Sequence, residues 1–402
     1  MPDPTTADPA ATDPTAPRST RTPVPDAPTE RAREWAATMG GHVVEPDGVV
    51  QAHATAGPSV GPAPVLDRAA REELEDAALA PGATRAVGAG HRAVAEEPDP
   101  ERTCFERDRD RILHSAAFRR LAGKTQVFVH PEDHQRTRLT HALEVAQVAS
   151  AISRSVGLNV ALTEAIALGH DCGHGPGGHA SEDAFTPFVD GGYDHAVWGA
   201  EVVLAPLNLC TETLDGIRNH SWSRPVPGTP EGEVVSWADR IAYVCHDFED
   251  AVHVGIVTPE QLPAVVRDRC GDRRSRQLHS FIDAVVDSVR RTGRIGMPPD
   301  LAEALAEFRR FNYEHIYMRP ASLAQNDAVV RLLRALVEFH ADHPFLTGGR
   351  AEDAPDSGLA AGTPEAVRRA VTYVGGMTDR YAFDQACTHL GWRTDELPRG
   401  IG

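Results

Sequence analysis

The sequence has few of the features that would place it in a specialised class of protein. It has no apolar run near the roughly 18 residues that a membrane-spanning helix needs. Its first residues lack the basic-then-apolar pattern of an export signal. Its six cysteines contain no C-x-x-C pair, which argues against a zinc ribbon or a disulfide framework and suits a reducing compartment. We therefore expect a cytoplasmic protein without a membrane segment.

Acidic residues outnumber basic ones, 58 to 40, and arginine supplies almost all of the positive charge. The net charge of −18 disfavours a protein that coats nucleic acid through bulk electrostatics, so no nucleic-acid partner is expected. Lys124 is the only lysine. A GC-rich genome explains most of this bias, but the retention of one lysine hints that position 124 needs a compact ammonium group.

Strand-like alternation of apolar and polar residues is nearly absent, and helical spacing takes its place. Apolar residues recur three and four positions apart in 107–121, 139–156 and 161–168. In the first of these segments, Asp108 and four arginines lie largely off the apolar face, as they would on an exposed helix face. Further helices are predicted at 259–267, 273–292, 298–316, 322–342 and 364–390. The expected fold class is all-α, a multi-helix assembly with its site between helices.

Composition divides the chain into three predicted parts. Residues 1–30 hold eight prolines and few large apolar side chains, and no sustained period follows before residue 71. We therefore expect residues 1–70 to form a disordered or weakly ordered N-terminal extension. Residues 71–258 are the predicted core domain, and residues 259–402 are a predicted helical C-terminal accessory region.

The most informative stretch runs from Arg138 to Glu182. It contains R-L-T-H, which ends at His141, then G-H-D-C-G-H, which includes His170 and Asp171, then G-G-H-A-S-E. Neighbours on a helix point about 100° apart, so an adjacent His–Asp pair can bind one ion only where the helix ends. The glycine-rich run after this pair supplies such an end.

The His–Asp pair alone is weak evidence for a metal site. The evidence is stronger when His141, from the preceding helix, and Asp239, from a later helix, are added to His170 and Asp171. Two imidazoles and two carboxylates form a mixed nitrogen and oxygen set, which suits Fe²⁺, Mn²⁺, Ni²⁺ or Mg²⁺ rather than a closed thiolate zinc site. Four protein ligands on an octahedral ion leave positions for water and for a phosphate oxygen of a substrate.

Around these residues the sequence resembles the deoxyguanosine triphosphate triphosphohydrolase family of the HD phosphohydrolase superfamily. The ordered set of His141, His170, Asp171 and Asp239 is similar to the H…HD…D signature of the superfamily. The blocks that resemble the triphosphohydrolase family are Phe105–Ile112, His114–Ser115, Phe118–Leu121, Lys124–Phe128, Arg138–His141, Ala238–Tyr243, His246–Asp247, Phe311–Glu314 and Gly375–Tyr381. They extend over roughly four fifths of the chain and are far more specific than a His–Asp pair alone.

The resemblance implies hydrolysis of a deoxynucleoside triphosphate, with dGTP among the substrates, to the deoxynucleoside and inorganic tripolyphosphate. It implies a divalent metal cofactor, Mn²⁺, Mg²⁺ or Fe²⁺, with the ligands His141, His170, Asp171 and Asp239. It implies substrate contacts at Arg138, Gln126 and Lys124, and a catalytic pocket with His174, His179, Glu182 and His195. It also implies an HD-domain core, a phosphohydrolase-associated C-terminal region and a homo-oligomer.

The chemistry of these residue types fits such roles. His179 and Glu182 are three positions apart on a predicted helix, so Glu182 could orient the His179 imidazole for acid–base work. His174 and His195, if protonated, would neutralise phosphate oxygens. Arg138 would present a planar guanidinium that forks onto the same phosphate.

Some residues have a plainer interpretation or depart from the family pattern. The histidines that we expect to be helix caps or core residues are His130, His134, His220, His246 and His253. The family has an aromatic residue in the loop where this chain has Gly177. Loss of that ring predicts a more mobile loop and a less filled pocket wall.

Two alternative functions stay open at this point. One is another HD-type hydrolase that acts on nucleoside monophosphates or cyclic nucleotides. The other is a nucleotide-sensing protein that binds without turnover, against which the retention of His179 and Glu182 argues.

Overall fold

The structure, a computed structural model, describes residues 27–38, 40–44, 48–55, 57–129, 135–347, 359–398 and 400. The chain divides into two compact units, Met1–Val65 and Leu66–Gly402. Most of the proline-rich segment 1–30 lies outside the described residues, as do His130 and His134.

The described part of the first unit contains one helix and one hairpin. The helix is α1 (Glu30–Ala37), and strands β1 (His42–Val44) and β2 (Val49–Gln51) pair antiparallel. The hairpin was not predicted, because strands of three residues are too short to show an alternating pattern.

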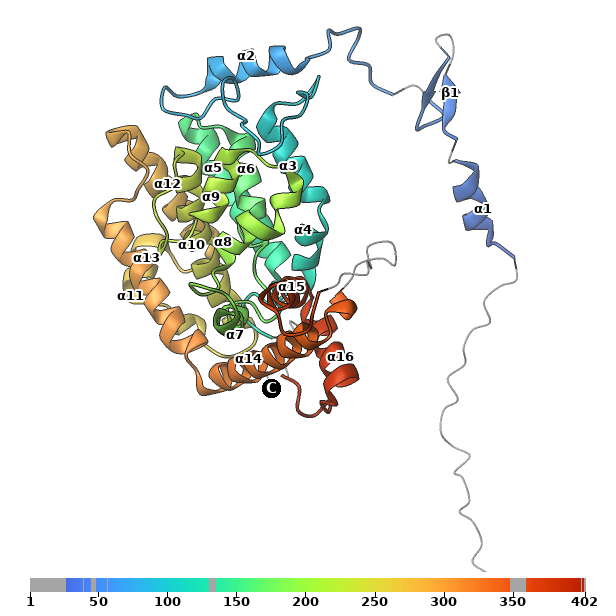
Figure 1. Ribbon diagram of the computed structural model, residues 1–402. Helices are drawn as coiled ribbons and strands as arrows, with labels where there is room; N and C mark the ends of the chain where they lie inside the picture. The colour runs from blue at the N-terminus through green and yellow to red at the C-terminus, as the bar shows by residue number, and fades with distance from the viewer. Residues whose placement is uncertain are drawn as a thin grey trace, which may run out of the picture. The chain divides into compact units, whose positions relative to one another are not determined.

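The second unit is an assembly of helices, which confirms the predicted all-α class (Figure 1). Its helices are α2 (Arg68–Ala78), α3 (Cys104–His114), α4 (Ala116–Arg120), α5 (Arg138–Val156), α6 (Val160–Gly169), α7 (Ala180–Phe185), α8 (His195–Trp198), α9 (Thr211–Arg218), α10 (Pro230–His253), α11 (Ala264–Cys270), α12 (Arg274–Thr292), α13 (Pro299–Asn312), α14 (Pro320–Asp342), α15 (Pro364–Gly375) and α16 (Asp379–Leu390). The predicted domain boundaries at residues 70 and 258 stay predictions.

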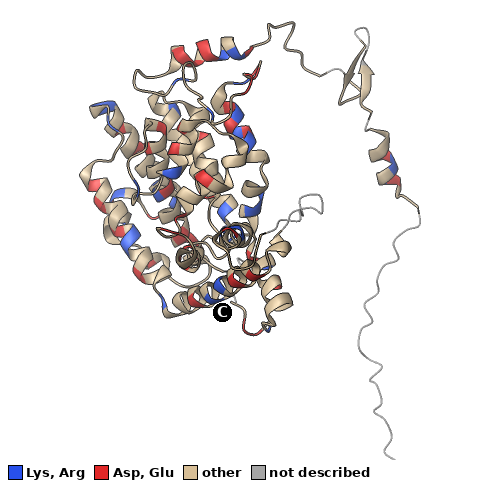
Figure 2. Ribbon diagram, viewed as in Figure 1, with Lys and Arg blue, Asp and Glu red and all other residues tan. Residues whose placement is uncertain are grey.

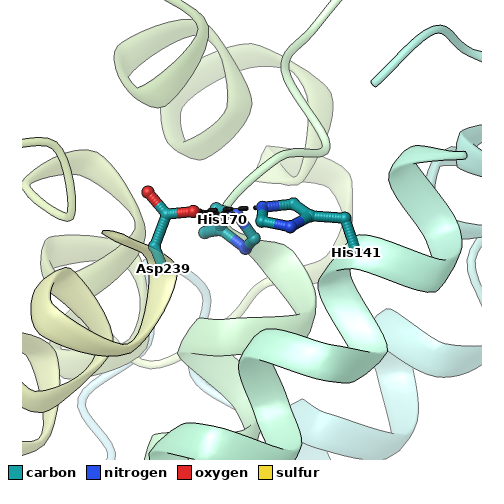
Figure 3. Close-up of side chains that lie close together, drawn as sticks. All are labelled: His141, His170 and Asp239. Carbon is teal, nitrogen blue, oxygen red and sulfur yellow. Dashed lines mark hydrogen bonds and ion pairs between the residues drawn. The ribbon is translucent and has the colours of Figure 1, made fainter. Parts of the chain in front are cut away.

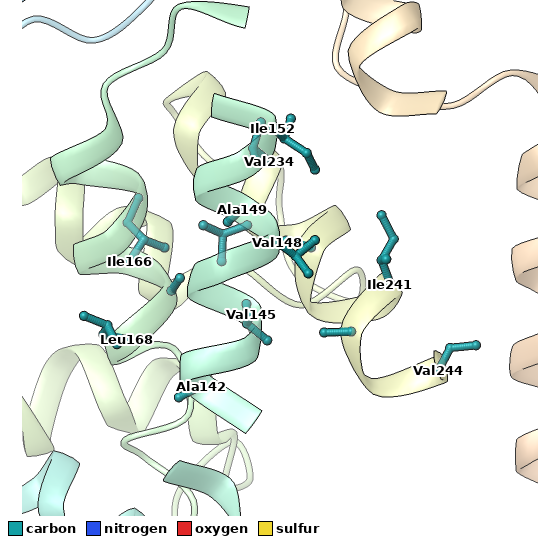
Figure 4. Packing of buried hydrophobic residues seen from close by; sticks show 14 of the residues in the cluster. Ala142, Val145, Val148, Ala149, Ile152, Ile166, Leu168, Val234, Ile241 and Val244 are labelled. Carbon is teal, nitrogen blue, oxygen red and sulfur yellow. The ribbon is translucent and has the colours of Figure 1, made fainter. Parts of the chain in front are cut away.

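Helices α5, α6 and α10 form the centre of the larger core. Figure 4 shows buried side chains of these helices, among them Ala142, Val145, Val148, Ala149, Ile152, Ile166, Leu168, Val234, Ile241 and Val244. Each large apolar side chain that is fully buried contributes roughly 1.5–3 kcal/mol. This packing holds the three helices in place, and the candidate site lies at the start of α5, just after the end of α6 and along α10.

A second core joins α7 to the three C-terminal helices α14, α15 and α16, which lie together in Figure 1. Phe185 of α7 and Val329 of α14 belong to this core, with Val374 of α15 and Phe383 of α16. The accessory region therefore packs directly against the helix that follows the glycine-rich loop.

Two predicted helices are each divided in two. The predicted helix 107–121 breaks at Ser115, which ends α3 and whose side chain accepts a hydrogen bond from the N–H of Phe118 at 3.0 Å. The predicted helix 364–390 breaks before Thr378, which caps α16 through the N–H of Tyr381. Hydroxyl side chains satisfy free N–H groups at a helix start, so a helix can restart although the apolar spacing continues.

Asp108 lies off the apolar face of its predicted helix, yet it is not exposed in the structure. Its side chain is fully buried and forms an ion pair with Arg92 at 2.6 Å. It also accepts hydrogen bonds from the N–H of Cys210 and the hydroxyl of Thr213, at 2.7 and 2.8 Å. Periodicity cannot reveal such a group, because its partners come from distant segments.

Acidic and basic positions both occur along the outer helices, for example along α14 (Figure 2). None of the helices in the described ranges has both the length and the apolar character that a membrane-spanning helix requires.

Candidate active site

Three of the four residues predicted to bind a metal, His141, His170 and Asp239, lie close together in Figure 3. The fourth, Asp171, lies beside them. His141 lies on the first turns of α5, His170 directly follows α6 and Asp239 lies on α10. Nε2 of His141 is 3.0 Å from Oδ1 of Asp239 and 3.8 Å from Oδ2 of Asp171. As predicted, the His–Asp pair stands where a helix ends and the chain turns.

The orientation of His170 fits a metal ligand. Its Nδ1–H donates to the carbonyl oxygen of Ala167 at 2.7 Å, which leaves Nε2 with a free lone pair. Nε2 is buried and has no hydrogen-bond partner, yet it lies 3.5 Å from Oδ1 of Asp171 and 3.8 Å from Oδ1 of Asp239. A divalent ion bound by these atoms would satisfy them, so the donor set fits the metal that the sequence implies.

The electrostatics of the two carboxylates agree with that interpretation. Burial alone would raise the pKa of Asp171, but His170 and Arg138 outweigh burial and hold this pKa well below its usual value. Burial likewise opposes ionisation of Asp239, but the hydrogen bond with His141, together with the other nearby histidines, outweighs burial and lowers the pKa of Asp239. Both carboxyl groups are therefore ionised at neutral pH, as metal ligands must be.

Arg138, the first residue of α5, has its guanidinium beside these carboxylates. Its Nη1 donates to Oδ2 of Asp171 at 2.7 Å, and its side chain is almost completely buried. Its Nε and Nη2 are buried without a hydrogen-bond partner. Arg138 is one of the residues that line the pocket, where its positive charge suits an anionic ligand.

The four residues predicted for the catalytic pocket also converge. The imidazole rings of His174 and His195 stack with centroids 3.7 Å apart, and the ring of His179 meets that of His174 edge-on at 5.0 Å. Burial and the guanidinium of Arg138 lower the pKa of His174, which favours its neutral form. His179 is exposed within the pocket lining, where a ligand can reach it.

Glu182 has a different partner from the one that its spacing suggested. Its Oε1 accepts hydrogen bonds from the backbone N–H of His195, at 3.0 Å, and from Nδ1 of the same residue. The suggestion that Glu182 orients His179 is therefore wrong. Burial disfavours the charged form of His195, but the Glu182 carboxylate outweighs burial and raises the pKa of His195.

His220 lies in the site, although the sequence led us to expect a cap or core residue. Its Nδ1–H donates to the carbonyl oxygen of Ile217 at 2.8 Å, and its Nε2 is 3.2 Å from Nε2 of His195. Its ring centroid is 4.9 Å from that of His170. No spacing in the sequence links residue 220 to the His–Asp pair, and its only signal is its position directly after an amphipathic helix.

Most of these residues, though not His170 or Glu182, line one pocket with a volume of about 640 Å³. Gln126 lines it too, and its buried Oε1 has no hydrogen-bond partner. A second polar group lies further along α10. There the hydroxyl of Tyr317 donates to Oδ2 of Asp247 at 2.5 Å, and Nε of Arg309 donates to the hydroxyl of Tyr243 at 2.8 Å.

The structure differs from two predictions, the substrate contact of Lys124 and the less filled pocket wall at Gly177. Lys124 does not line the pocket, and its Nζ donates to the carbonyl oxygens of His174 and Gly375. Gly177 is buried with a φ of +71°, and a Cβ there would come within 2.4 Å of Cγ1 of Val329. The prediction of a less filled wall is wrong, because α14 fills the space that a larger side chain would need.

Comparison with known families agrees with this architecture. Residues 138–244 match the HD domain, and residues 295–387 match the phosphohydrolase-associated domain. A helical HD domain with a buried cluster of histidine and aspartate side chains defines the class of this protein, an HD-domain phosphohydrolase.

Curated relatives narrow the class to a family. A deoxyguanosinetriphosphate triphosphohydrolase-like protein of Caldanaerobacter subterraneus is 39% identical over 319 residues, which cover 77% of this chain and 92% of that protein. A protein of the same description from Geobacter sulfurreducens is 35% identical and covers 80% of this chain and 97% of its own length. The chain belongs to the deoxyguanosinetriphosphate triphosphohydrolase-like family.

Similarity to solved structures is more distant. A phosphohydrolase from Bacteroides thetaiotaomicron aligns with a TM-score of 0.43 at 16% identity, over 69% of this chain and 66% of that one. A hypothetical protein from Aquifex aeolicus aligns with a TM-score of 0.45 at 17% identity, over 72% of this chain and 69% of that one.

Proposed function

We propose that this phosphohydrolase cleaves deoxynucleoside triphosphates, dGTP among them, into the deoxynucleoside and inorganic tripolyphosphate. The observation that carries the proposal is the unpartnered Nε2 of His170, which faces two ionised carboxylates beside the free donors of Arg138. A cation site next to a fixed guanidinium suits a phosphate group. The relatives from Caldanaerobacter subterraneus and Geobacter sulfurreducens are described as deoxyguanosinetriphosphate triphosphohydrolase-like, which supports the choice of a deoxynucleoside triphosphate.

We assign His141, His170, Asp171 and Asp239 to the divalent cation. When bound, the cation supplies Lewis-acid stabilisation of the negative charge that develops on the α-phosphate. The donor set of two imidazoles and two carboxylates suits Mn²⁺, Mg²⁺ or Fe²⁺.

The side chains around the cation site have roles that follow from their positions. Arg138 donates two hydrogen bonds to oxygens of the α-phosphate and fixes its orientation. His195, held by Glu182, adds positive charge on the side of the leaving group or the attacking water. A water oxygen adds to the α-phosphorus and gives a proton to His179, whose pKa is lowered to about 4 by burial and which is therefore neutral at pH 7. The bond to the 5′-oxygen breaks, and that oxygen takes a proton from the solvent.

The polar group further along α10 fits the nucleoside half of the substrate. Asp247 comes eight residues after Asp239, a distance of about 12 Å along the helix axis. A deoxynucleoside attached to the α-phosphate spans a similar length. We therefore assign Asp247 and Tyr317 to the sugar.

The experiment is product analysis of the purified chain with Mn²⁺, Mg²⁺ or Fe²⁺ and each of the four deoxynucleoside triphosphates, separated by ion exchange. Equal amounts of deoxynucleoside and tripolyphosphate are expected. Nucleoside monophosphate with pyrophosphate, or the absence of turnover with every metal and nucleotide, contradicts the proposal. Turnover of nucleoside monophosphates or cyclic nucleotides alone would favour another HD-type hydrolase. The homo-oligomer, the cytoplasmic location and the lack of a nucleic-acid partner stay predictions.

A further inference from the structure

The glycine-rich loop that carries His174 is tied to the C-terminal helices by the only lysine of the chain. Nζ of Lys124 donates to the carbonyl oxygen of His174, within the loop, and to that of Gly375, at the end of α15, at 2.9 Å. Lys124 is 2% exposed, so both hydrogen bonds are shielded from water. One ammonium group therefore connects the accessory region to the backbone of a pocket residue.

Asp379, the first residue of α16, connects the same two regions from the other side. Its Oδ1 accepts a hydrogen bond from the N–H of Gly177 at 2.8 Å. Its Oδ2 accepts from the N–H and the hydroxyl of Thr125, at 3.0 and 2.5 Å. Asp379 is 3% exposed, and its three hydrogen bonds offset the cost of burying the carboxylate.

Close packing leaves the loop little room to move. A Cβ on Gly177 would meet Cγ1 of Val329 at 2.4 Å, and a Cβ on Gly178 would meet Nη2 of Arg138 at 2.7 Å. The backbone of the loop thus lies directly against the guanidinium that we assign to the substrate. A shift of the loop would disturb His174, His179 and Arg138 together.

The hydrophobic core of α7, α14, α15 and α16 already holds these helices together. A buried lysine and a buried aspartate are not needed for that purpose, because buried ionic groups seldom add net stability over apolar ones. Their hydrogen bonds instead end on backbone groups of the loop, at His174 and Gly177. The compact ammonium fits between two carbonyl oxygens where the wide fork of a guanidinium would not.

We propose that Lys124 and Asp379 are positioning residues, which fix the loop 173–178 from α15 and α16 and so place His174 and His179 in the pocket. Neither residue touches the substrate. The kinetic part of this inference rests on the proposed function, whereas the order of the loop does not. It follows that the accessory region contributes to the geometry of the site.

The test compares variants that remove single bonds of this arrangement. Asp379→Asn keeps the shape of the side chain, but its amide NH₂ group cannot accept a hydrogen bond as the second carboxylate oxygen does. Thr125→Val removes the hydroxyl group that donates to Asp379, and Thr125→Ser keeps a hydroxyl group at that position. The matched control is Asp384→Asn, an exposed aspartate of the same helix. The measurements are amide hydrogen exchange over residues 173–181, bound metal, kcat and KM, all well below the unfolding temperature.

We expect faster exchange of the loop amides in Asp379→Asn and Thr125→Val, with bound metal unchanged. A misplacement of catalytic groups by about 1 Å lowers rates by about a hundredfold, so kcat should fall by about tenfold to a hundredfold while KM changes little. Thr125→Ser and Asp384→Asn should behave as the unchanged chain does.

Several outcomes would overturn the inference. Unchanged exchange in both Asp379→Asn and Thr125→Val shows that these bonds do not order the loop. Faster exchange with unchanged kcat shows that loop order does not position the catalytic groups. If Asp379→Asn fails to fold, Thr125→Val and its serine counterpart decide the question. If the unchanged chain turns over no nucleotide, the proposed function fails, and the exchange measurement alone decides whether the loop is fixed in this way.

Discussion

The carboxylate of Glu182 is bonded to His195 through both the backbone N–H and Nδ1, although His179 is its neighbour in helical spacing. The pairing joins the first turn of α7 to the first residue of α8. This pairing holds the His195 ring in the orientation in which it stacks on the His174 ring. Glu182 therefore acts on the pocket through His195.

The first prediction follows from this pairing. Glu182→Gln weakens the hold on His195, and we expect kcat to fall roughly tenfold to a hundredfold with bound metal unchanged, as is typical when an orienting group is lost. Steady-state kinetics and metal analysis of the same samples check this. Asp190→Asn, an exposed position in the loop between α7 and α8, is the control and should have no effect. Normal turnover in Glu182→Gln would show that the pairing has no catalytic role.

The second prediction concerns the candidate metal ligands. His170→Ala or Asp239→Ala should abolish bound divalent metal and lower turnover by more than about a hundredfold, beyond the effect of losing an orienting group. His246→Ala is the matched control, because this buried histidine lies on α10 but pairs with Glu144, outside the cluster. Removal of metal with a chelator and its return should abolish and restore turnover. Full metal content in His170→Ala, measured by elemental analysis, would contradict the assignment.

The third prediction separates two costs at Gly177. Gly177→Ala must adopt a φ of +71° and also clash with Val329, so the free energy of unfolding should fall by about 2–4 kcal/mol. Gly191→Ala is the control, since its φ is +81° but no atom lies within 4 Å of the added Cβ, and it should lose only about 1–2 kcal/mol. Chemical denaturation of both variants measures the difference. A cycle with Val329→Ala should show that part of the Gly177 cost depends on the Val329 side chain, and equal losses at the two glycines would contradict the clash.

The fourth prediction is a pH dependence of stability that arises from His340 on α14. Burial lowers the pKa of His340 to about 4, with smaller effects from His389 and His343, and neither ring nitrogen has a hydrogen-bond partner. An unfolded histidine titrates near pH 6.5, so the unfolded chain binds a proton between about pH 6.5 and 4 that the folded chain excludes. Stability is therefore retained above this window and declines as the pH falls through it.

His340→Gln should remove this component. The loss of unfolding free energy between pH 7 and pH 5 should shrink by about 1–2 kcal/mol in the variant, as measured by urea denaturation at both values. The same substitution at the exposed His279 is the control. An identical pH dependence in His340→Gln and the unchanged chain would show that His340 is already protonated in the folded state.

The sequence predicted the central features because they are local or come in ordered blocks. The helix of His141 and the helix end at His170 follow from apolar spacing and from the glycine run, and both were confirmed. The break at Ser115 was missed because a single hydroxyl cap does not interrupt the apolar spacing. Local signals thus located the helices better than their junctions.

Contacts between distant segments were the part that could not be predicted. His220 reaches His195 from a different helix end, and Glu182 selects a partner 13 residues away rather than three. Lys124 reaches Gly375 across 251 positions of sequence. In each case the partners meet only after the helices have packed, and no period in the sequence encodes that meeting.

The ion pair between Arg138 and Asp171 links two binding events. Oδ2 of Asp171 accepts from Arg138, while Oδ1 of the same carboxylate faces His170 and His174. Any movement of this carboxylate that a cation causes must also change the donors that Arg138 offers to an anion. By thermodynamic reciprocity, an anion that binds Arg138 changes the affinity for the cation by the same factor. The affinity of the proposed metal site is thus expected to depend on whether an anion is bound as well as on the four ligand residues.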